Sequence, residues 1–205
     1  MTIAQPKEAS GARPPEPTGD ASSKGELVHV LKGFDVRTYA KASEIPFEPA
    51  NAALLDYVHG QQKVLLEVAG LKVDAAAHVR TFWSHIDEYL APKGSFYLAW
   101  SPEGKIMGTG AMRQVDDKTG EMKHLYVHPD ARGAGLGRWL VERRMQDAKA
   151  QGLTTLVADT LRGNVAMPRL YASLGFEEVS PGAESRSVGV MPELIDHLRF
   201  FRRKL

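Results

Sequence analysis

Three glycines occupy five positions in the stretch Arg132-Gly133-Ala134-Gly135-Leu136-Gly137. Glycine loses more conformational entropy on folding than any other residue, so folding alone does not favour three of them here. What they allow is a loop whose backbone N–H groups turn inward without Cβ atoms in the way. The residues after the loop predict a helix, and N–H groups at a helix N-terminus attract anions. The stretch therefore predicts a site for a phosphate or pyrophosphate.

Two common phosphate loops do not fit these residues. A P-loop ends in Gly-Lys-Ser/Thr, whereas Gly137 is followed by Arg138 and Trp139. A dinucleotide-binding loop has the pattern G-x-G-x-x-G directly after a strand, and here Arg138 stands in place of the last glycine. Asp159 could imitate the ribose-binding acid of that fold, but the glycine spacing is wrong.

A third pattern matches in register. The loop is similar to the R/Q-x-x-G-x-G/A pyrophosphate loop of the GNAT superfamily of N-acetyltransferases, at Arg132, Gly135 and Gly137. Residues 121–129 resemble the fourth strand of that family, which leads into the loop. Residues 170–176, Leu-Tyr-Ala-Ser-Leu-Gly-Phe, resemble its L-Y-x-x-x-G-F pattern. The three segments occur in the family's order and at its spacing.

The resemblance, which covers roughly Ser95 to Val179, implies a fold and an activity. The fold would be α/β (α+β), with a central mixed, mostly antiparallel sheet that is splayed between its fourth and fifth strands and flanked by helices. The activity would be transfer of an acetyl group from acetyl-CoA to a primary amine, for which we expect a small-molecule acceptor. A protein lysine or N-terminus is an alternative acceptor, and a non-catalytic acyl-CoA-binding module on the same fold is an alternative function.

The resemblance also implies which residues bind the coenzyme. Backbone N–H groups of Leu125, Tyr126 and Val127, freed by a strand bulge, would bind the pantetheine arm and the thioester carbonyl. Asn164 would bind the pantetheine amide, or else cap the next helix. Pro168 allows that helix to begin later, which would leave Asn164 in the loop. The pyrophosphate would be held by the loop itself: Arg132, Gly133, Ala134, Gly135, Leu136, Gly137 and Arg138.

Two residues are predicted to catalyse the transfer. Tyr171 matches the family tyrosine whose hydroxyl faces the coenzyme sulfur and would protonate the leaving thiolate; packing of a helix is its alternative role. Glu121 lies eleven residues before Arg132, the spacing of the general base in histone-type members. An alkylammonium must lose a proton before it can attack, and His124 or a water molecule could take that proton instead.

The amino-acid composition limits the mechanisms, partners and cellular locations that we expect. The chain has 205 residues, a net charge of +1 and no cysteine. We therefore expect direct transfer in a ternary complex, no acyl-cysteine, no disulfide and no metal site. No nucleic-acid or membrane partner and no signal peptide are expected, so the predicted location is cytoplasmic; a homodimer is left open. The basic cluster Arg138, Arg143 and Arg144 is expected at the surface, or near the 3′-phosphate of the coenzyme.

The chain divides into two parts of different composition. Residues 1–24 are rich in Pro, Ser and Gly and have few apolar side chains, which predicts a flexible tail, and 25–205 would form a single domain. Apolar periodicity predicts helices at 46–62, 74–90, from the loop to 151, and 164–174, with strands at 26–31, 34–39, 95–100, 105–114, 121–127, 153–159, 176–179 and 198–205. The long connection 181–197 would border the acceptor.

Overall fold

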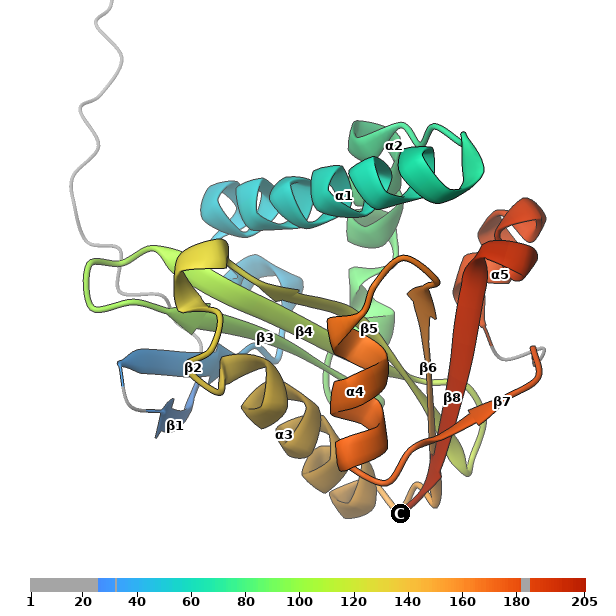
Figure 1. Cartoon of the computed structure of the whole chain (residues 1–205). Helices are drawn as coiled ribbons and strands as arrows, with labels where there is room; N and C mark the ends of the chain where they lie inside the picture. The colour runs from blue at the N-terminus through green and yellow to red at the C-terminus, as the bar shows by residue number, and fades with distance from the viewer. Residues whose placement is uncertain (1–25, 32, 182–184) are drawn as a thin grey trace, which may run out of the picture.

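A single sheet forms the centre of the protein in the computed structural model, which describes residues 26–31, 33–181 and 185–205 (Figure 1). The tail predicted at 1–24 lies outside these residues. The strands are β1 (Glu26–Leu31), β2 (Phe34–Thr38), β3 (Gly94–Trp100), β4 (Ile106–Gln114), β5 (Thr119–Val127), β6 (Thr155–Leu161), β7 (Glu177–Val179) and β8 (Leu198–Lys204). Their order in the sheet is β1-β2-β3-β4-β5-β6-β8-β7.

Among these strands one pair is parallel, β5 with β6, and the other neighbours are antiparallel. A parallel pair needs a long crossover, which α3 (Leu136–Ala150) supplies. The remaining helices are α1 (Phe47–Ala69), α2 (Ala75–Ser84), α4 (Ala166–Ser173) and α5 (Arg186–Val190), with 3₁₀ turns at Ala42–Glu44, Ile86–Tyr89, Pro129–Ala131 and Pro192–His197. The predicted mixed, mostly antiparallel sheet flanked by helices is confirmed.

The sheet opens between β5 and β6. Their register pairs Thr119 with Thr155 and continues only to Met122 opposite Ala158. Beyond that point β5 stays paired with β4 and β6 with β8, so the two strands separate. Counted from β2, these are the fourth and fifth strands, and β1 is an extra strand at the edge.

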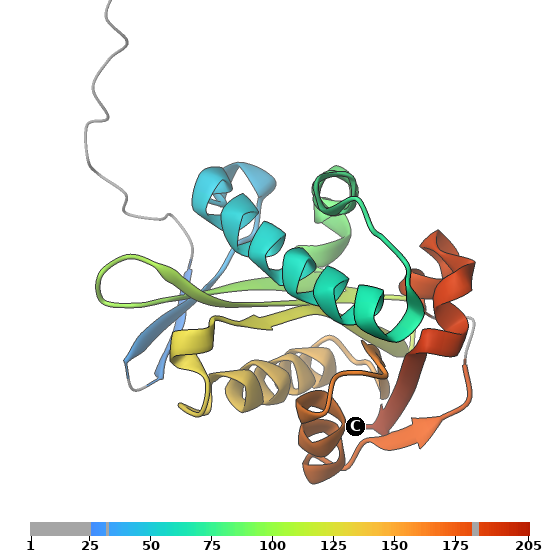
Figure 2. The same ribbon diagram turned by 45° about the horizontal axis from the view of Figure 1, so that its top comes forward.

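Helices cover both faces of the sheet, with α1 and α2 on one side and α3 and α4 on the other (Figure 2). The central strand β3 explains why both faces need cover. Its alternating side chains divide between two clusters: Phe96 and Leu98 pack under α1 and α2, whereas Tyr97 and Ala99 pack against α3. All four are completely buried.

Two helices differ in length from the prediction. α1 continues past residue 62 to Ala69 and ends at Gly70, which adopts the left-handed conformation with φ of 65°. α2 stops at Ser84 instead of residue 90, and a 3₁₀ turn follows. There the Ser84 hydroxyl and the His85 ring both bond to the carbonyl of Thr81, and such local side-chain bonds compete with helix continuation.

Candidate active site

A β-bulge interrupts β5 beside the opening in the sheet. Thr109 pairs with Tyr126 and Ala111 with Lys123, so Gly110 faces two residues, His124 and Leu125. His124 has φ of 51° and is the one non-glycine residue of the described chain with a positive φ. An extra residue of this kind leaves its strand locally unpaired and re-aims the neighbouring groups. The bulge therefore lies within the segment predicted to bind the coenzyme thioester.

The glycine loop follows β5 and ends at α3. Gly133 and Gly135 have φ of 81° and 85°, and a Cβ at either position would meet no atom within 4 Å. Glycine is thus needed there for backbone conformation and not for space. Gly135 is the N-cap of α3, without a side-chain cap or an acidic residue in the first turn. The N–H groups of this turn are accordingly available to an anion.

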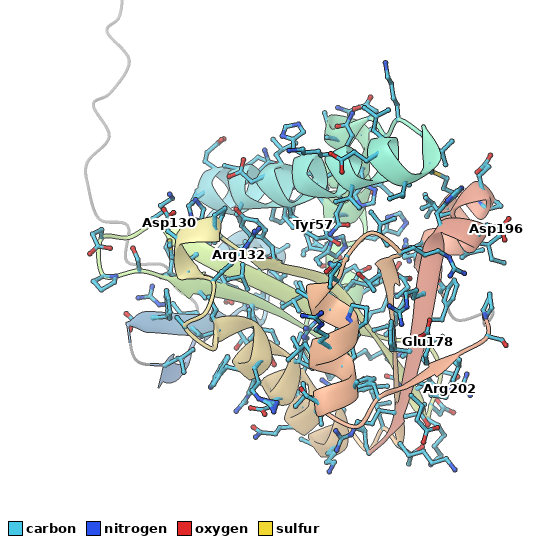
Figure 3. All side chains as sticks on the ribbon, viewed as in Figure 1. Tyr57, Asp130, Arg132, Glu178, Asp196 and Arg202 are labelled. Atoms are coloured by element: carbon cyan, nitrogen blue, oxygen red, sulfur yellow. The ribbon has the colours of Figure 1, made fainter. Side chains whose placement is uncertain are left out.

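Arg132 ties the loop to the strand before it. Its Nε donates to the carbonyl of Val127 at 3.3 Å, next to the Pro129–Ala131 turn (Figure 3). Pyrophosphate binding by Arg132, Gly133, Ala134, Gly135, Leu136, Gly137 and Arg138 stays a prediction.

A cavity of about 350 Å³ occupies the opening between β5 and β6. Its walls come from α1 and α2 on one face of the sheet, from α4 on the other face, and from α5 with the turn that follows it. Three of the predicted site residues, Leu125, Asn164 and Tyr171, line it together. Tyr57 reaches it from α1 (Figure 3).

Tyr171 is held firmly in the wall of this cavity. It is buried, and its ring packs against Phe176 at 5.1 Å and Phe201 at 5.0 Å between ring centroids. Burial raises the pKa of Tyr171 to about 12, although the nearby charge of Arg144 acts in the opposite direction. The phenol is therefore protonated at neutral pH and can donate a proton.

Asn164 caps α4 in this structure. Its Oδ1 accepts hydrogen bonds from the backbone N–H groups of Ala166 and Met167, both at 3.1 Å. The helix begins at Ala166 and accommodates Pro168 in its first turn. The side-chain NH₂ of Asn164 takes no part in the cap, so a contact with pantetheine stays a prediction.

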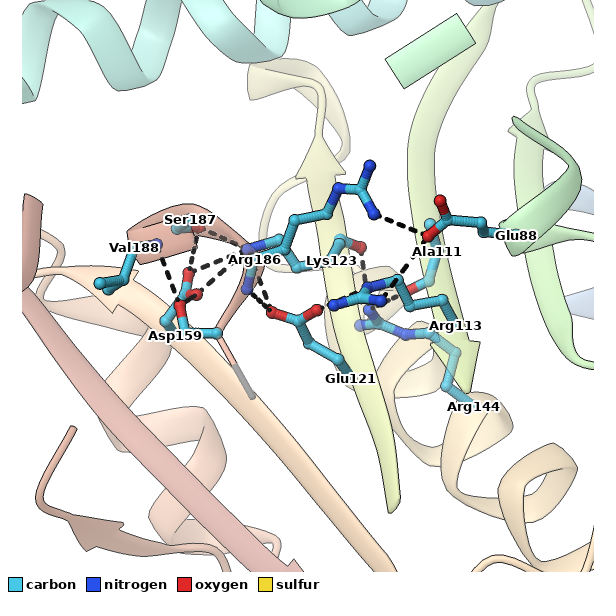
Figure 4. Close-up of polar contacts among 11 residues, drawn as sticks. Glu88, Ala111, Arg113, Glu121, Lys123, Arg144, Asp159, Arg186, Ser187 and Val188 are labelled. Carbon is cyan, nitrogen blue, oxygen red and sulfur yellow. Dashed lines mark hydrogen bonds and ion pairs between the residues drawn. The ribbon is translucent and has the colours of Figure 1, made fainter. Parts of the chain in front are cut away.

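Glu121 lies in a network of ionic contacts (Figure 4). Its side chain is 1% exposed, and its Oε2 accepts from Arg113 Nε at 2.8 Å. Its Oε1 accepts from the backbone N–H of Arg186 at 2.9 Å and lies 3.6 Å from Lys123 Nζ. Glu121 is not among the residues that line the 350 Å³ cavity. The geometry gives this carboxylate a structural role, and its role as a base stays a prediction.

Lys123 continues the same network. Its Nζ lies 3.1 Å from Asp159 Oδ2 and also donates to the hydroxyl of Ser187, at the start of α5. Burial disfavours a charged lysine, but the carboxylates of Asp159 and Glu121 outweigh this effect and raise the pKa of Lys123 above its usual range.

His124 faces the cavity among aromatic rings. Its ring centroid is 4.5 Å from that of Phe82 and 5.8 Å from those of Tyr57 and Tyr89. Burial and the charge of Lys123 hold the pKa of His124 well below its ordinary value, so the ring is neutral at pH 7. Its Nδ1 is buried without a hydrogen-bond partner. The bulge thus presents a neutral imidazole to the cavity.

No sequence motif marks the opposite wall of the cavity. Tyr57, His78 and Phe82 come from α1 and α2, where a helical apolar pattern predicts only core packing. Nothing in that pattern distinguishes an aromatic side chain in the core from one beside a cavity.

The described residues show neither a candidate metal site nor a candidate membrane-spanning helix. They contain no group of three or more His, Cys, Asp or Glu side chains that could hold a metal ion. None of their helices has the length and apolar character needed to cross a membrane.

Comparison with known proteins identifies the class. A family model described as Acetyltransferase (GNAT) family matches residues 66–176, more than half of the 205 residues. The chain belongs to this family, as its loop and strand motifs predicted.

Two curated proteins illustrate the sequence similarity of this chain to other N-acetyltransferases. Human N-acetyltransferase 8B is 36% identical over 106 residues, which are 49% of this chain and 47% of that protein. The L-methionine sulfoximine/L-methionine sulfone acetyltransferase of Pseudomonas paraeruginosa is 30% identical over 119 residues, 51% of this chain and 69% of the enzyme. The chain therefore spans only about half the length of the human relative.

Solved structures share the fold at low identity. An acetyltransferase from Streptococcus agalactiae 2603 has a TM-score of 0.61 and 24% identity, over 85% of this chain and 99% of that one. A PaiA N-acetyltransferase from Thermoplasma acidophilum in complex with coenzyme A has a TM-score of 0.59 and 13% identity, over 83% and 99%.

Proposed function

We propose that this protein transfers an acetyl group from acetyl-CoA to the primary amine of a small molecule. The observation that carries the proposal is the cavity between β5 and β6, where the bulge, Asn164 and Tyr171 come together. The sulfoximine/sulfone acetyltransferase from Pseudomonas is named for small-molecule acceptors, and the Thermoplasma neighbour is in complex with coenzyme A. We also propose a cytoplasmic location.

The residues fit the coenzyme on structural grounds. The uncapped N-terminus of α3 and the left-handed Gly133 and Gly135 form a turn whose N–H groups and helix dipole favour a pyrophosphate. The bulge interrupts the pairing with β4 at His124 and Leu125, and the pairing resumes at Tyr126 and Val127. Because β6 pairs with β5 only as far as Met122, N–H groups of Leu125 to Val127 that point toward the opening would meet the pantetheine arm and the thioester. One N–H fixed on the developing oxyanion is worth about 3 kcal/mol in a typical acyl transfer.

Tyr171 would act as the acid. When the amine nitrogen bonds to the acetyl carbon, the carbon–sulfur bond breaks and the electron pair leaves on sulfur. The hydroxyl of Tyr171 gives its proton to that thiolate, and the phenolate is later reprotonated by the proton that the amine has released. A buried phenol that stays protonated at neutral pH is suited to this task.

Two side chains are proposed for the amine proton. Glu121 has the family spacing, but Arg113 and the backbone of Arg186 engage both of its oxygens. His124 lines the cavity and is neutral, which supports it more strongly. The apolar wall and the charge of Lys123 also favour the uncharged form of an amine that enters the cavity.

The deciding experiment is a panel of amines, amino acids, polyamines and peptides, scored by release of the coenzyme A thiol. Turnover of a small amine with intersecting double-reciprocal lines would support the proposal. Turnover of peptides alone would indicate a protein acceptor. Binding of acetyl-CoA without any turnover would indicate an acyl-CoA-binding module. Parallel lines, or a stable acetyl-enzyme seen by mass spectrometry, would rule out direct transfer.

A further inference from the structure

Arg144 occupies a position where the helix pattern calls for an apolar residue. It follows Leu136 and Leu140 at four-residue spacing on the buried side of α3, and Ala148 comes next. All four residues are at most 1% exposed, and Arg144 is 0% exposed. The prediction that Arg144 belongs to a basic surface cluster is therefore wrong. It failed because a run of Arg138, Arg143 and Arg144 suggests a solvated face, whereas the helical spacing turns only Arg144 inward.

The guanidinium bonds only to neutral groups. Nε donates to the carbonyl of Leu140 at 2.9 Å, and Nη1 donates to the carbonyls of Ala111 at 3.1 Å and Lys123 at 3.2 Å (Figure 4). Ala111 and Lys123 are the paired residues that border the bulge. Arg144 forms no ion pair with a carboxylate of the described residues, and its Nη2 is buried without a partner. Burying such a charge is costly, so a packing role alone does not account for it.

Arg144 and Tyr171 line the same cavity from neighbouring helices. Desolvation lowers the pKa of Arg144 to about 10, and after desolvation the interaction with Tyr171 is the largest influence on it. Conversely, the charge of Arg144 is the strongest influence that lowers the pKa of Tyr171. The charge of each group therefore affects the ionisation of the other. At neutral pH Arg144 carries a positive charge and Tyr171 is uncharged.

We infer that Arg144 is a positioning residue whose fixed positive charge stabilises the anionic form of Tyr171 while the hydroxyl gives its proton to the leaving sulfur. The inference rests on the proposed acetyl transfer. In the balanced step the nitrogen–carbon bond forms, the carbon–sulfur bond breaks, and the proton passes from the phenol oxygen to sulfur. Arg144 itself exchanges no proton; it stabilises the phenolate until the amine's proton reaches it.

Two substitutions of Arg144 separate charge from packing. Arg144→Met removes the charge and keeps a long unbranched chain, and Arg144→Lys keeps the charge without the planar fork. We expect Arg144→Met to lower kcat by about 10²-fold, within the range of one lost proton-transfer contribution, with KM for acetyl-CoA nearly unchanged. Arg144→Lys should recover a large part of the loss. The matched control is Arg199→Met, since Arg199 pairs with Glu178 in an exposed contact, and its kcat should stay at the wild-type level.

A double-mutant cycle with Tyr171→Phe tests the connection between the two residues. If Arg144 acts through the hydroxyl, either Arg144 substitution should have little further effect on kcat in the Tyr171→Phe background. An equal fold loss in both backgrounds would overturn the inference, because a packing defect does not depend on the hydroxyl. Thermal melting of each variant shows whether it folds. If Arg144→Met does not fold, the cycle with Arg144→Lys tests whether Arg144 acts through the Tyr171 hydroxyl.

A second measurement does not depend on turnover. With 3,5-difluorotyrosine incorporated in place of tyrosine, the phenol at position 171 is more acidic and ionises below the pKa of about 10 of Arg144, so the arginine keeps its charge during the titration. The ¹⁹F resonance of residue 171 is assigned by its loss in Tyr171→Phe. It should titrate at a higher pH in Arg144→Met than in the wild type, and an unchanged titration would overturn the inference. If the wild type acetylates no amine, the proposed function fails, whereas this titration still decides whether Arg144 stabilises the Tyr171 phenolate.

Discussion

Lys123 and Asp159 form a largely buried ion pair at the point where β5 and β6 separate. The last backbone pair between the strands is Met122 with Ala158, and Lys123 and Asp159 are the next residues on each strand. Their Nζ and Oδ2 atoms lie 3.1 Å apart, and the two side chains are 12% and 10% exposed. A side-chain pair thus replaces the backbone ladder at the edge of the opening.

Asp159→Asn should destabilise the fold because it leaves the charge of Lys123 buried beside a single, more distant carboxylate. Loss of one partner of a buried pair costs about 3–5 kcal/mol, which corresponds to a fall in Tm of about 6–20 °C at about 2–4 °C per kcal/mol. The control is Glu178→Gln, which removes an exposed ion pair with Arg199 and should change Tm little. Equal Tm values for the two variants would contradict a structural role of the buried pair.

The pH dependence of this effect follows from the raised pKa of Lys123. A lysine whose pKa is higher in the folded protein stabilises fully below its unfolded value of about 10.4, and the contribution is lost as the pH rises through the folded value. Lys123 therefore contributes no pH dependence to the Tm of the wild type from pH 6 to pH 9. Melting curves of the wild type across that range measure it, and a Tm that falls steeply near pH 8 would contradict a charged lysine.

Gly135→Val should weaken acetyl-CoA binding strongly while the protein stays folded. The substitution forces a branched residue into a backbone with φ of 85° at the N-cap of α3, which disturbs the N–H groups proposed to hold the pyrophosphate. Gly104→Val is the matched control, since Gly104 has φ of 79° and lies in the turn between β3 and β4. Calorimetry should show a large affinity loss for the first variant alone. Similar affinities for both would count against the loop.

The sequence predicted most of the fold because the determining signals are local. The glycine loop, the apolar strands and the crossover through α3 all appear as short patterns with fixed spacing. The length of α1 could not be predicted, since polar residues interrupt its pattern before the buried Leu65 resumes it. The end of α2 depends on hydrogen bonds from Ser84 and His85 that periodicity does not record.

The candidate site was predicted only where a motif marks it. Tyr171 and the loop have such motifs. The partners of Glu121 do not: Arg113 and Arg186 lie 8 and 65 residues away in sequence and meet it only through strand pairing and the docking of α5. The burial of Arg144 likewise could not be predicted without knowing which side of α3 faces the sheet, because its charge suggests a solvent-exposed position.

The α5 segment should influence the acceptor and not the coenzyme. Arg186 Nη1 lies 2.7 Å from Glu88 Oε2, and Ser185 and Ser187 bond to Asp159, so α5 is fastened beside the cavity. We expect Arg186→Met to loosen this contact and raise KM for the amine several-fold without a change in acetyl-CoA affinity. Arg199→Met, which removes an exposed pair, should change neither value. Equal effects of Arg186→Met on both substrates would contradict the prediction.

Tyr171→Phe tests the proposed acid directly, because it keeps the ring that packs against Phe176 and Phe201 and removes only the hydroxyl. Loss of a proton donor should lower kcat by about 10²–10⁴-fold, while acetyl-CoA affinity changes little. Since burial raises the pKa of Tyr171 to about 12, the donor form persists throughout neutral and mildly alkaline pH. The wild-type kcat should therefore show no loss from Tyr171 ionisation below about pH 11, one unit under that pKa. Stopped-flow or steady-state assays with a poorly reactive amine keep chemistry rate-limiting. A Tyr171→Phe variant that retains kcat under that condition would reduce Tyr171 to a packing residue.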